Sequence, residues 1–215
     1  MGTAERKEKE KSEMTKRILD TAIRLFLDEG FENVSLRRIA DKIEYSPSTI
    51  YLYFKDKNEI LYALHTAGFE MLYERQLTIL SIKDPLERLR RHAELYIEFA
   101  LENREYYDLM FIMRGPAEKM KEKEEWNIGL RSYDFLRQNV RECIGAGYIP
   151  DAQLDVATFS FWSHVHGIAS IIIRDRCRMF PEEQIPLIIQ GSASFITDLI
   201  RKKKINTQSV SKGDL

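Results

Sequence analysis

The chain is 215 residues long and 44% hydrophobic, which is enough to bury a core in one or two globular domains without disulfide bonds. Its 33 lysines and arginines balance 34 aspartates and glutamates, and the net charge of −1 excludes a basic protein that coats polyanions along its whole length. Two cysteines and a charged start without an apolar segment predict a soluble cytoplasmic protein. The apolar stretch 159–173 is interrupted by serines and histidines and is shorter than a membrane span.

Apolar residues recur every three or four positions, and only ten glycines and six prolines interrupt them, so we predict an all-α protein. The first helix should end at Gly30, a residue type that favours helix C-termini. A short second helix should begin with Ser35 as its N-cap. A short third helix should begin with Ser46 as its N-cap and Pro47 in its first turn.

Longer helices are expected after these three. Asp56 precedes Glu59 at the spacing of a capping box, and Asp84 precedes Glu87 in the same way. Further helices are predicted near residues 104–113, 117–144, 151–177 and 182–203. We therefore predict about nine helices, divided into a domain of residues 1–57 (flexible up to about residue 11), a domain of residues 58–203 and a disordered tail of residues 204–215.

The third helix has an unusual composition. Residues 46–54 carry no charge, although a solvent-exposed helix normally carries lysine and glutamate, and hydroxyl groups stand on Ser48, Thr49, Tyr51 and Tyr53. Such a surface is suited to contact a polar partner and can form hydrogen bonds with base edges and phosphate oxygens. The alternative is a small helical subdomain in which the tyrosines only pack against their neighbours.

The segment around this helix has the proportions of a helix-turn-helix, because two helices of two to three turns are joined by Glu44 and Tyr45. Its charge signal is weak, since five cations against three anions within residues 35–57 leave a local net charge of +2. The five cations are Arg37, Arg38, Lys42, Lys55 and Lys57.

Residues 15 to about 64 resemble the N-terminal domain of the TetR family of bacterial transcriptional regulators. The resemblance rests on a set of residues: Ile18, Ala22, Leu25, Phe26, Gly30, Phe31, Val34, Ser35, Leu36, Ile39, Ala40, Ser46, Ile50, Tyr51, Tyr53, Phe54, Lys57 and Leu61. It implies a three-helix, helix-turn-helix DNA-binding domain, joined by a long helix to a C-terminal helical domain that binds a ligand and dimerises. It also implies a ligand-responsive repressor, which binds a pseudo-palindromic operator as a homodimer and is released by a small-molecule effector.

The family pattern implies roles for individual residues. Residues 46–53 would form the recognition helix, in which Tyr51 and Tyr53 reach phosphates or base edges. Lys57 would meet a phosphate at the start of the fourth helix. The full set expected to contact DNA is Ser35, Arg37, Arg38, Ser46, Pro47, Ser48, Thr49, Tyr51, Tyr53, Lys55 and Lys57.

One turn departs from the family pattern, which commonly has a small Gly-Val pair before the serine of the third helix. This chain has Glu44 and Tyr45 there. We expect Glu44 to adopt a left-handed backbone, which is unfavourable for its residue type, and to bring its carboxylate near phosphates. Tyr45 would either fill the place of the valine or extend the DNA-binding surface.

The C-terminal part resembles the Trp-His-Gly type of TetR C-terminal domain through Trp162, His166 and Gly167. That resemblance implies that the last two long helices pack against their copies in a second subunit, as a four-helix bundle. It also implies an effector pocket, and the many aromatic and methionine side chains suit a hydrophobic or aromatic small molecule. The residues expected to line it are Tyr107, Phe111, Trp162 and His166.

Two other functions stay open from the residues alone. A small helical enzyme would pair His164 or His166 with Asp175 or Glu142, but no spacing favours a dyad and no catalytic motif is apparent. The two histidines would point about 200° apart on a helix and could not share a metal ion, so neither metal nor cofactor is expected. The other alternative is a helical adaptor that binds protein, whose interactions would depend much less on salt than DNA binding does.

Overall fold

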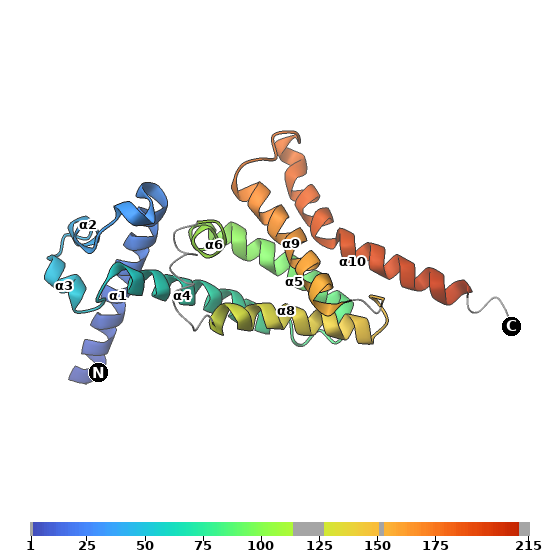
Figure 1. Cartoon of the computed structure of the whole chain (residues 1–215), viewed down its shortest axis with the longest axis horizontal. Coiled ribbons are helices and arrows are strands. Elements are labelled where there is room, and N and C mark those ends of the chain that lie inside the picture. The colour runs from blue at the N-terminus through green and yellow to red at the C-terminus, as the bar shows by residue number, and fades with distance from the viewer. Residues whose placement is uncertain (1, 114–126, 151–152, 211–215) are drawn as a thin grey trace. The chain divides into compact units, whose positions relative to one another are not determined.

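The computed structural model describes residues 2–113, 127–150 and 153–210, with the backbone alone for residues 3, 127 and 202–210. All regular secondary structure in these residues is helical (Figure 1), as the sequence predicts. The elements in chain order are α1 (Thr3–Glu29), the 3-10 turn η1 (Phe31–Asn33), α2 (Leu36–Lys42), α3 (Pro47–Tyr51), α4 (Lys57–Leu77), α5 (Pro85–Glu102), α6 (Arg104–Phe111), α8 (Asn127–Gly145), α9 (Leu154–Ile173), the 3-10 turn η2 (Glu182–Gln184) and α10 (Ile185–Val210).

The helix starts that were predicted from capping residues are confirmed. The hydroxyls of Ser35 and Ser46 accept backbone N–H groups of α2 and α3 at 3.1 and 3.3 Å. The carboxylates of Asp56 and Asp84 each accept two N–H groups at the starts of α4 and α5, at 2.8 to 2.9 Å. Each of these oxygens satisfies donors that have no partner inside the first turn of a helix.

Two helices are longer than predicted. α1 begins at Thr3, before the expected limit near residue 11, because ion pairs four residues apart on the exposed start of the helix support its first turns. α10 continues to Val210, so residues 204–210 extend the helix instead of belonging to the tail. The predicted helix over 117–144 is observed as α8 from Asn127, and residues 114–126, 151–152 and 211–215 lie outside the described residues.

The helices form two compact units. Of the described residues, unit 1 contains 2–70 and 104–113, and unit 2 contains 71–103, 127–150 and 153–210. The division therefore falls inside α4, later than the predicted boundary near residue 57. The physical reason is that Ile60, Leu61 and Leu64 of α4, together with Leu109 of α6, belong to the same hydrophobic core as α1 to α3.

The core of unit 1 is built on α1. The rings of Phe26 and Phe31 meet edge to face with centroids 5.0 Å apart, and Ile50 of α3 is fully buried, as its position in the helix predicts. α6 approaches α4 at Gly68, where an added β-carbon would lie 2.5 Å from the sulfur of Met110. A side chain at Gly68 would therefore require the Met110 side chain to shift.

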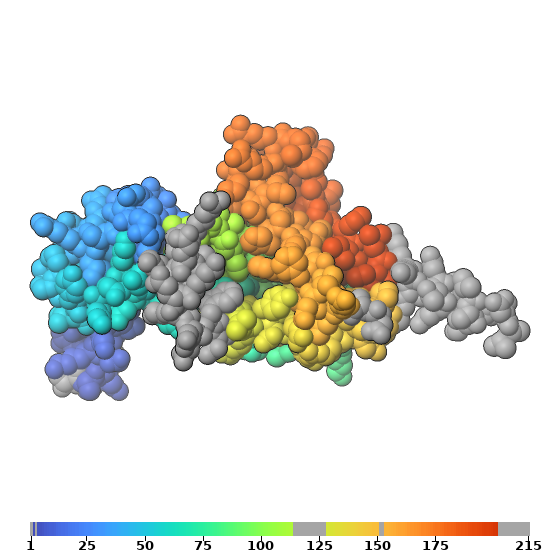
Figure 2. All heavy atoms as spheres, in the orientation of Figure 1, coloured from blue at the N-terminus to red at the C-terminus, as the bar shows by residue number. Residues whose placement is uncertain are grey.

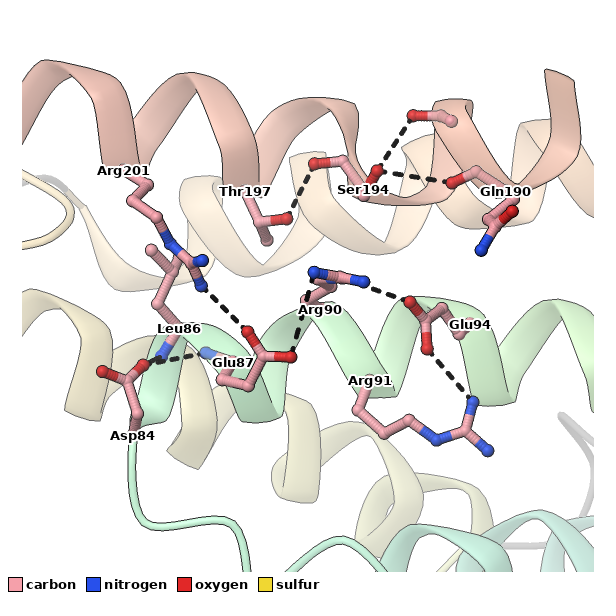
Figure 3. A network of polar contacts seen from close by, with 11 residues as sticks. Asp84, Leu86, Glu87, Arg90, Arg91, Glu94, Gln190, Ser194, Thr197 and Arg201 are labelled. Atoms are coloured by element: carbon pink, nitrogen blue, oxygen red, sulfur yellow. Dashed lines mark hydrogen bonds and ion pairs between the residues drawn. The ribbon is translucent and has the colours of Figure 1, made fainter. Parts of the chain in front are cut away.

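Unit 2 is organised around α5, which packs against α8, α9 and α10. An ion pair joins α5 to α10, as Figure 3 shows: Arg201 of α10 donates to Glu87 of α5 at 2.9 Å. Within α5, Arg90 lies between Glu87 and Glu94. Deeper in the unit, the Gln76 amide donates to the His92 ring and the hydroxyl of Ser132 donates back to Gln76 at 3.1 Å. The helices of unit 2 are thus held by buried polar groups as well as apolar packing.

α9 is the most apolar helix of the described residues. Its 20 residues include a window with a mean hydropathy of 1.4, long and apolar enough to span a membrane, and 28% of that window is buried within this chain. The helix nevertheless carries polar contacts typical of a globular domain: His164 Nε2 lies 2.8 Å from the Ser192 carbonyl of α10, and His166 contacts Tyr96 of α5. α9 therefore packs one side against unit 2 and leaves apolar side chains exposed on the other.

Candidate nucleic-acid interface

α3 presents hydroxyl groups on its exposed side. Ser46 Oγ lies 2.7 Å from Ser48 Oγ and 3.0 Å from Thr49 Oγ1, so three hydroxyls gather at the start of the helix. Tyr51 is 60% exposed, whereas Tyr53 is half-buried against the core of unit 1. The arrangement offers uncharged donors and acceptors, which can contact base edges directly.

The turn between α2 and α3 has the strained backbone that the sequence predicts. Glu44 has φ of 63°, a left-handed conformation that is costly for a residue with a β-carbon. Tyr45 is 40% exposed, so it extends the surface and does not take a buried position. Arg17 of α1 holds this turn, because its guanidinium donates to the Ile43 carbonyl at 3.0 Å and lies 5.3 Å from the Tyr45 ring.

Arg17 is a contact that sequence reasoning missed. It lies 26 residues before Ile43 and outside the segment whose charges were counted, and no spacing rule connects a residue of α1 to this turn. Only the fold brings its guanidinium to the entrance of the recognition helix.

The predicted cations around α3 differ in whether an acidic side chain of the same chain already pairs with them. Arg38 makes a forked contact with Glu29 at 2.7 and 3.1 Å, and this hydrogen bond lowers the pKa of Glu29. Arg37 and Lys55 have exposed side chains. Within the predicted DNA-binding set, Arg37 and Lys55 are the two cations whose side chains make no hydrogen bond or ion pair among the described contacts.

A hollow with a volume of 430 Å³ lies beside α3 and is formed by the start of α2, the end of α3 and the start of α4. Five residues of the predicted DNA-binding set line it, namely Ser35, Arg37, Tyr51, Lys55 and Lys57. Two acids, Glu32 and Asp56, line it as well. A groove that joins hydroxyls and cations in this way fits a phosphate of a nucleic-acid backbone.

Lys57 is oriented differently from the expectation. Its ammonium donates to the carbonyls of Phe31 and Glu32 at 2.8 and 3.2 Å and lies 4.5 Å from the centre of the Phe31 ring. The side chain is 26% exposed. The ammonium is thus occupied by unit 1 itself.

The four residues predicted to line an effector pocket fall in both units. Tyr107 and Phe111 belong to α6 of unit 1, with ring centroids 5.3 Å apart. Trp162 and His166 belong to α9 of unit 2, with ring centroids 5.4 Å apart. In unit 2, the Tyr96 hydroxyl accepts from Trp162 Nε1 at 3.4 Å and lies 3.1 Å from His166 Nδ1, and burial lowers the pKa of His166.

The two histidines that could have served an enzyme point to different helices. His164 faces the Ser192 carbonyl of α10 and His166 faces Tyr96 of α5. Neither of the carboxylates considered as partners approaches them among the described contacts, since Glu142 pairs with Arg88 of α5 and Asp175 lies beyond the end of α9. The described side chains therefore assemble no dyad from these four residues.

Comparisons with known proteins agree with this arrangement. Residues 18–64 match the family described as bacterial regulatory proteins of the tetR family, and residues 89–187 match the family of tetracyclin repressor-like C-terminal domains. The HTH-type transcriptional regulator AcrR of Shigella flexneri is 29% identical over 153 residues, which are 67% of this chain and 71% of that protein.

Solved structures share the fold at lower identity. The TetR family regulator PfmR from Thermus thermophilus is 24% identical with a TM-score of 0.63, over 86% of this chain and 93% of that one. The transcriptional regulator FadR from Bacillus subtilis, solved in complex with stearoyl-CoA, is 16% identical with a TM-score of 0.68, over 85% of this chain and 97% of that one.

The helical fold and the hydroxyl-bearing helix-turn-helix define a DNA-binding transcriptional regulator. The chain belongs to the TetR family, which is a family of transcriptional regulators and not of enzymes. The Trp-His-Gly subtype of its C-terminal domain stays a prediction.

Proposed function

We propose that this chain is a ligand-responsive repressor that acts in the cytoplasm. It binds a pseudo-palindromic operator as a homodimer through α3 and is released when a hydrophobic small molecule binds its helical C-terminal domain. Ligand binding can release DNA only through a higher affinity for the state that does not bind DNA.

The DNA contacts proposed for each subunit lie on α2, α3 and the start of α4. Ser48, Thr49 and Tyr51 enter the major groove, while Ser35 and Arg37 contact the backbone. The wider set consists of Arg38, Ser46, Pro47, Tyr53 and Lys55. Lys57 was expected to contact a phosphate, but its ammonium is held by the carbonyls of Phe31 and Glu32, so it is left out of the proposed contacts. The observation that supports these DNA contacts is the exposed face of α3, which is uncharged and rich in hydroxyl groups. A helix that only faced solvent would normally carry lysine and glutamate there.

The dimer is proposed from exposed apolar side chains of α9 and α10, two helices whose atoms are drawn in orange and red in Figure 2. Phe159 and Ile171 of α9 are 57% and 49% exposed, and Leu187, Phe195 and Leu199 of α10 are 71%, 58% and 51% exposed. Exposed apolar side chains of this kind are unfavourable in water, and a second copy that covers them would form an isologous four-helix interface.

The effector part of the proposal rests on the aromatic cluster around Trp162 in unit 2. Trp162 packs edge to face against Tyr133 and Phe159, and the Tyr96 hydroxyl and His166 supply polar groups beside these rings. Large aromatic surfaces with few polar groups suit a hydrophobic ligand. The neighbour solved with stearoyl-CoA and a Clostridium perfringens neighbour described as a putative fatty acid metabolism regulator make acyl-CoA thioesters a sensible first probe.

Selection of bound fragments from random duplex DNA tests the proposal. We expect a palindrome with two half-sites about one helical turn apart, and an affinity that falls steeply as salt rises. Addition of a long-chain acyl-CoA, or of another hydrophobic compound from a screen, should release the recovered duplex. If the protein prefers no duplex at low salt, the proposal of a DNA-binding regulator is wrong. If it instead binds a protein with an affinity that salt does not change, the adaptor alternative is supported.

A further inference from the structure

Lys57 is the first residue of α4, and its ammonium makes four contacts inside unit 1. Two are hydrogen bonds to consecutive carbonyls of η1, at 2.8 Å to Phe31 and 3.2 Å to Glu32. The third is to the face of the Phe31 ring, 4.5 Å from its centre. The fourth is to the Glu32 carboxylate, 3.8 Å away. The two hydrogen bonds use two of the three ammonium donors, and the Glu32 carboxylate places an opposite charge beside them.

η1 is itself tightly held, so these contacts have a rigid anchor. Phe31 is 3% exposed and packs against Phe26 of α1. The chain then passes through the buried Val34 to Ser35, whose hydroxyl caps α2. Lys57 therefore connects the first turn of α4 with the segment that sets the start of the helix-turn-helix.

We propose that Lys57 is a positioning residue that clamps α4 to η1, and that Arg37 and Lys55 bind the DNA phosphate at the adjoining hollow. All three residues line that hollow, but Lys57 would have to give up two carbonyls and a ring face to reach a phosphate. Arg37 and Lys55 have no such cost, because their side chains are exposed.

The acids of the hollow agree with this division of roles. The carboxylate of Asp56 accepts the N–H groups of Asn58 and Glu59 at the start of α4, so it is engaged with the helix. Glu32 lies on the side of Lys57. The inference depends on DNA binding by the family, but not on repression, dimerisation or an effector.

Lysine acylation of the wild-type protein tests the clamp without any substitution. With limiting acetic anhydride and mass spectrometry, we expect Lys57 to react at least tenfold more slowly than Lys55 in the free protein. A duplex recovered by selection should slow the reaction of Lys55 and leave that of Lys57 unchanged. Equal reactivity of the two lysines in the free protein would overturn the clamp, and this arm is informative even if no duplex is found.

Salt dependence of DNA binding separates the two roles. Lys55→Met should lower the slope of log affinity against log salt by about 0.9 per subunit, with unchanged hydrogen exchange of the amides in residues 31–38. Lys57→Met, the matched variant, should keep the wild-type slope, weaken binding about tenfold at every salt concentration, and speed exchange in residues 31–38. A reduced slope with unchanged exchange in Lys57→Met would show that Lys57 contacts phosphate and that the proposal is wrong.

Discussion

α3 of unit 1 and the pair α9 and α10 of unit 2 both leave large side chains exposed, but of opposite chemistry. On α3 the exposed groups are hydroxyls, with Tyr51 at 60% exposure. On α9 and α10 they are aliphatic and aromatic carbons, such as Phe159 and Phe195. A polar surface without charge can exchange hydrogen bonds with water for hydrogen bonds with a polar partner. An apolar surface instead lowers the free energy of the system when a partner covers it and removes it from water.

The difference teaches that one chain can carry two recognition surfaces that follow different physics. Association through α9 and α10 should be hydrophobic and little affected by salt, because few charges are involved. Association through α3 and its flanking cations should fall steeply with salt.

The largest effect is expected at the apolar surface. Phe195→Glu would bury a carboxylate in the proposed subunit interface, at a cost of several kcal/mol. Light scattering at micromolar concentration should then give 25.3 kDa in place of twice that mass. Leu130→Glu is the matched control, since Leu130 of α8 is 50% exposed and lies outside α9 and α10; an equal loss of dimer in both variants would refute this interface.

The next effect is expected at the polar surface. Tyr51→Ala should weaken binding to a selected duplex by roughly 1–3 kcal/mol through loss of a contact to the DNA, with the helix content by circular dichroism unchanged. Tyr51→Phe removes only the hydroxyl and should show how much of the loss belongs to hydrogen bonding. An unaltered binding isotherm for Tyr51→Ala would remove this residue from the interface.

Much of this contrast could be predicted from the sequence, because it depends on local rules. The N-caps at Ser35 and Ser46, the burial of Ile50 and the left-handed Glu44 follow from spacing and residue type, and the structure confirms them. Such features are decided within a few residues of the chain. The same locality explains why the all-α class was predicted without any knowledge of the packing.

The parts that sequence reasoning missed depend on contacts between distant residues. Arg17 reaches Ile43 across 26 positions, and Lys57 reaches Phe31 across the same separation. The compact units also divide near residue 70 and not near residue 57, because the first half of α4 packs into the first core. No periodicity in the sequence shows where an amphipathic helix passes from one core to another.

The two units should also lose stability together as the pH falls. Burial lowers the pKa of His65 in unit 1 to about 4, although the backbone of Leu109 opposes the shift, and burial lowers the pKa of His92 in unit 2 to about 4. An unfolded histidine takes up its proton near pH 6.5, so stability falls as the pH decreases from there toward 4. His65→Leu should remove about 2 kcal/mol of the loss measured by urea unfolding between pH 7 and pH 5. If the variant loses as much stability as the wild type over that range, His65 is not the group responsible.

The smallest effect concerns strain at the entrance to the recognition helix. Glu44 and Asp175 both have positive φ, 63° and 52°, and a left-handed backbone costs a residue with a β-carbon roughly 1 kcal/mol or more. Glu44→Gly and Asp175→Gly should therefore each raise the free energy of unfolding by about 0.5–1 kcal/mol, part of the gain being offset by the greater freedom of glycine in the unfolded chain. Only Glu44→Gly should also tighten DNA binding, because it removes a carboxylate beside α3. Equal DNA affinities in the two variants would mean that the Glu44 carboxylate lies too far from any phosphate to weaken DNA binding. The strain at Glu44 would then have no connection with DNA recognition.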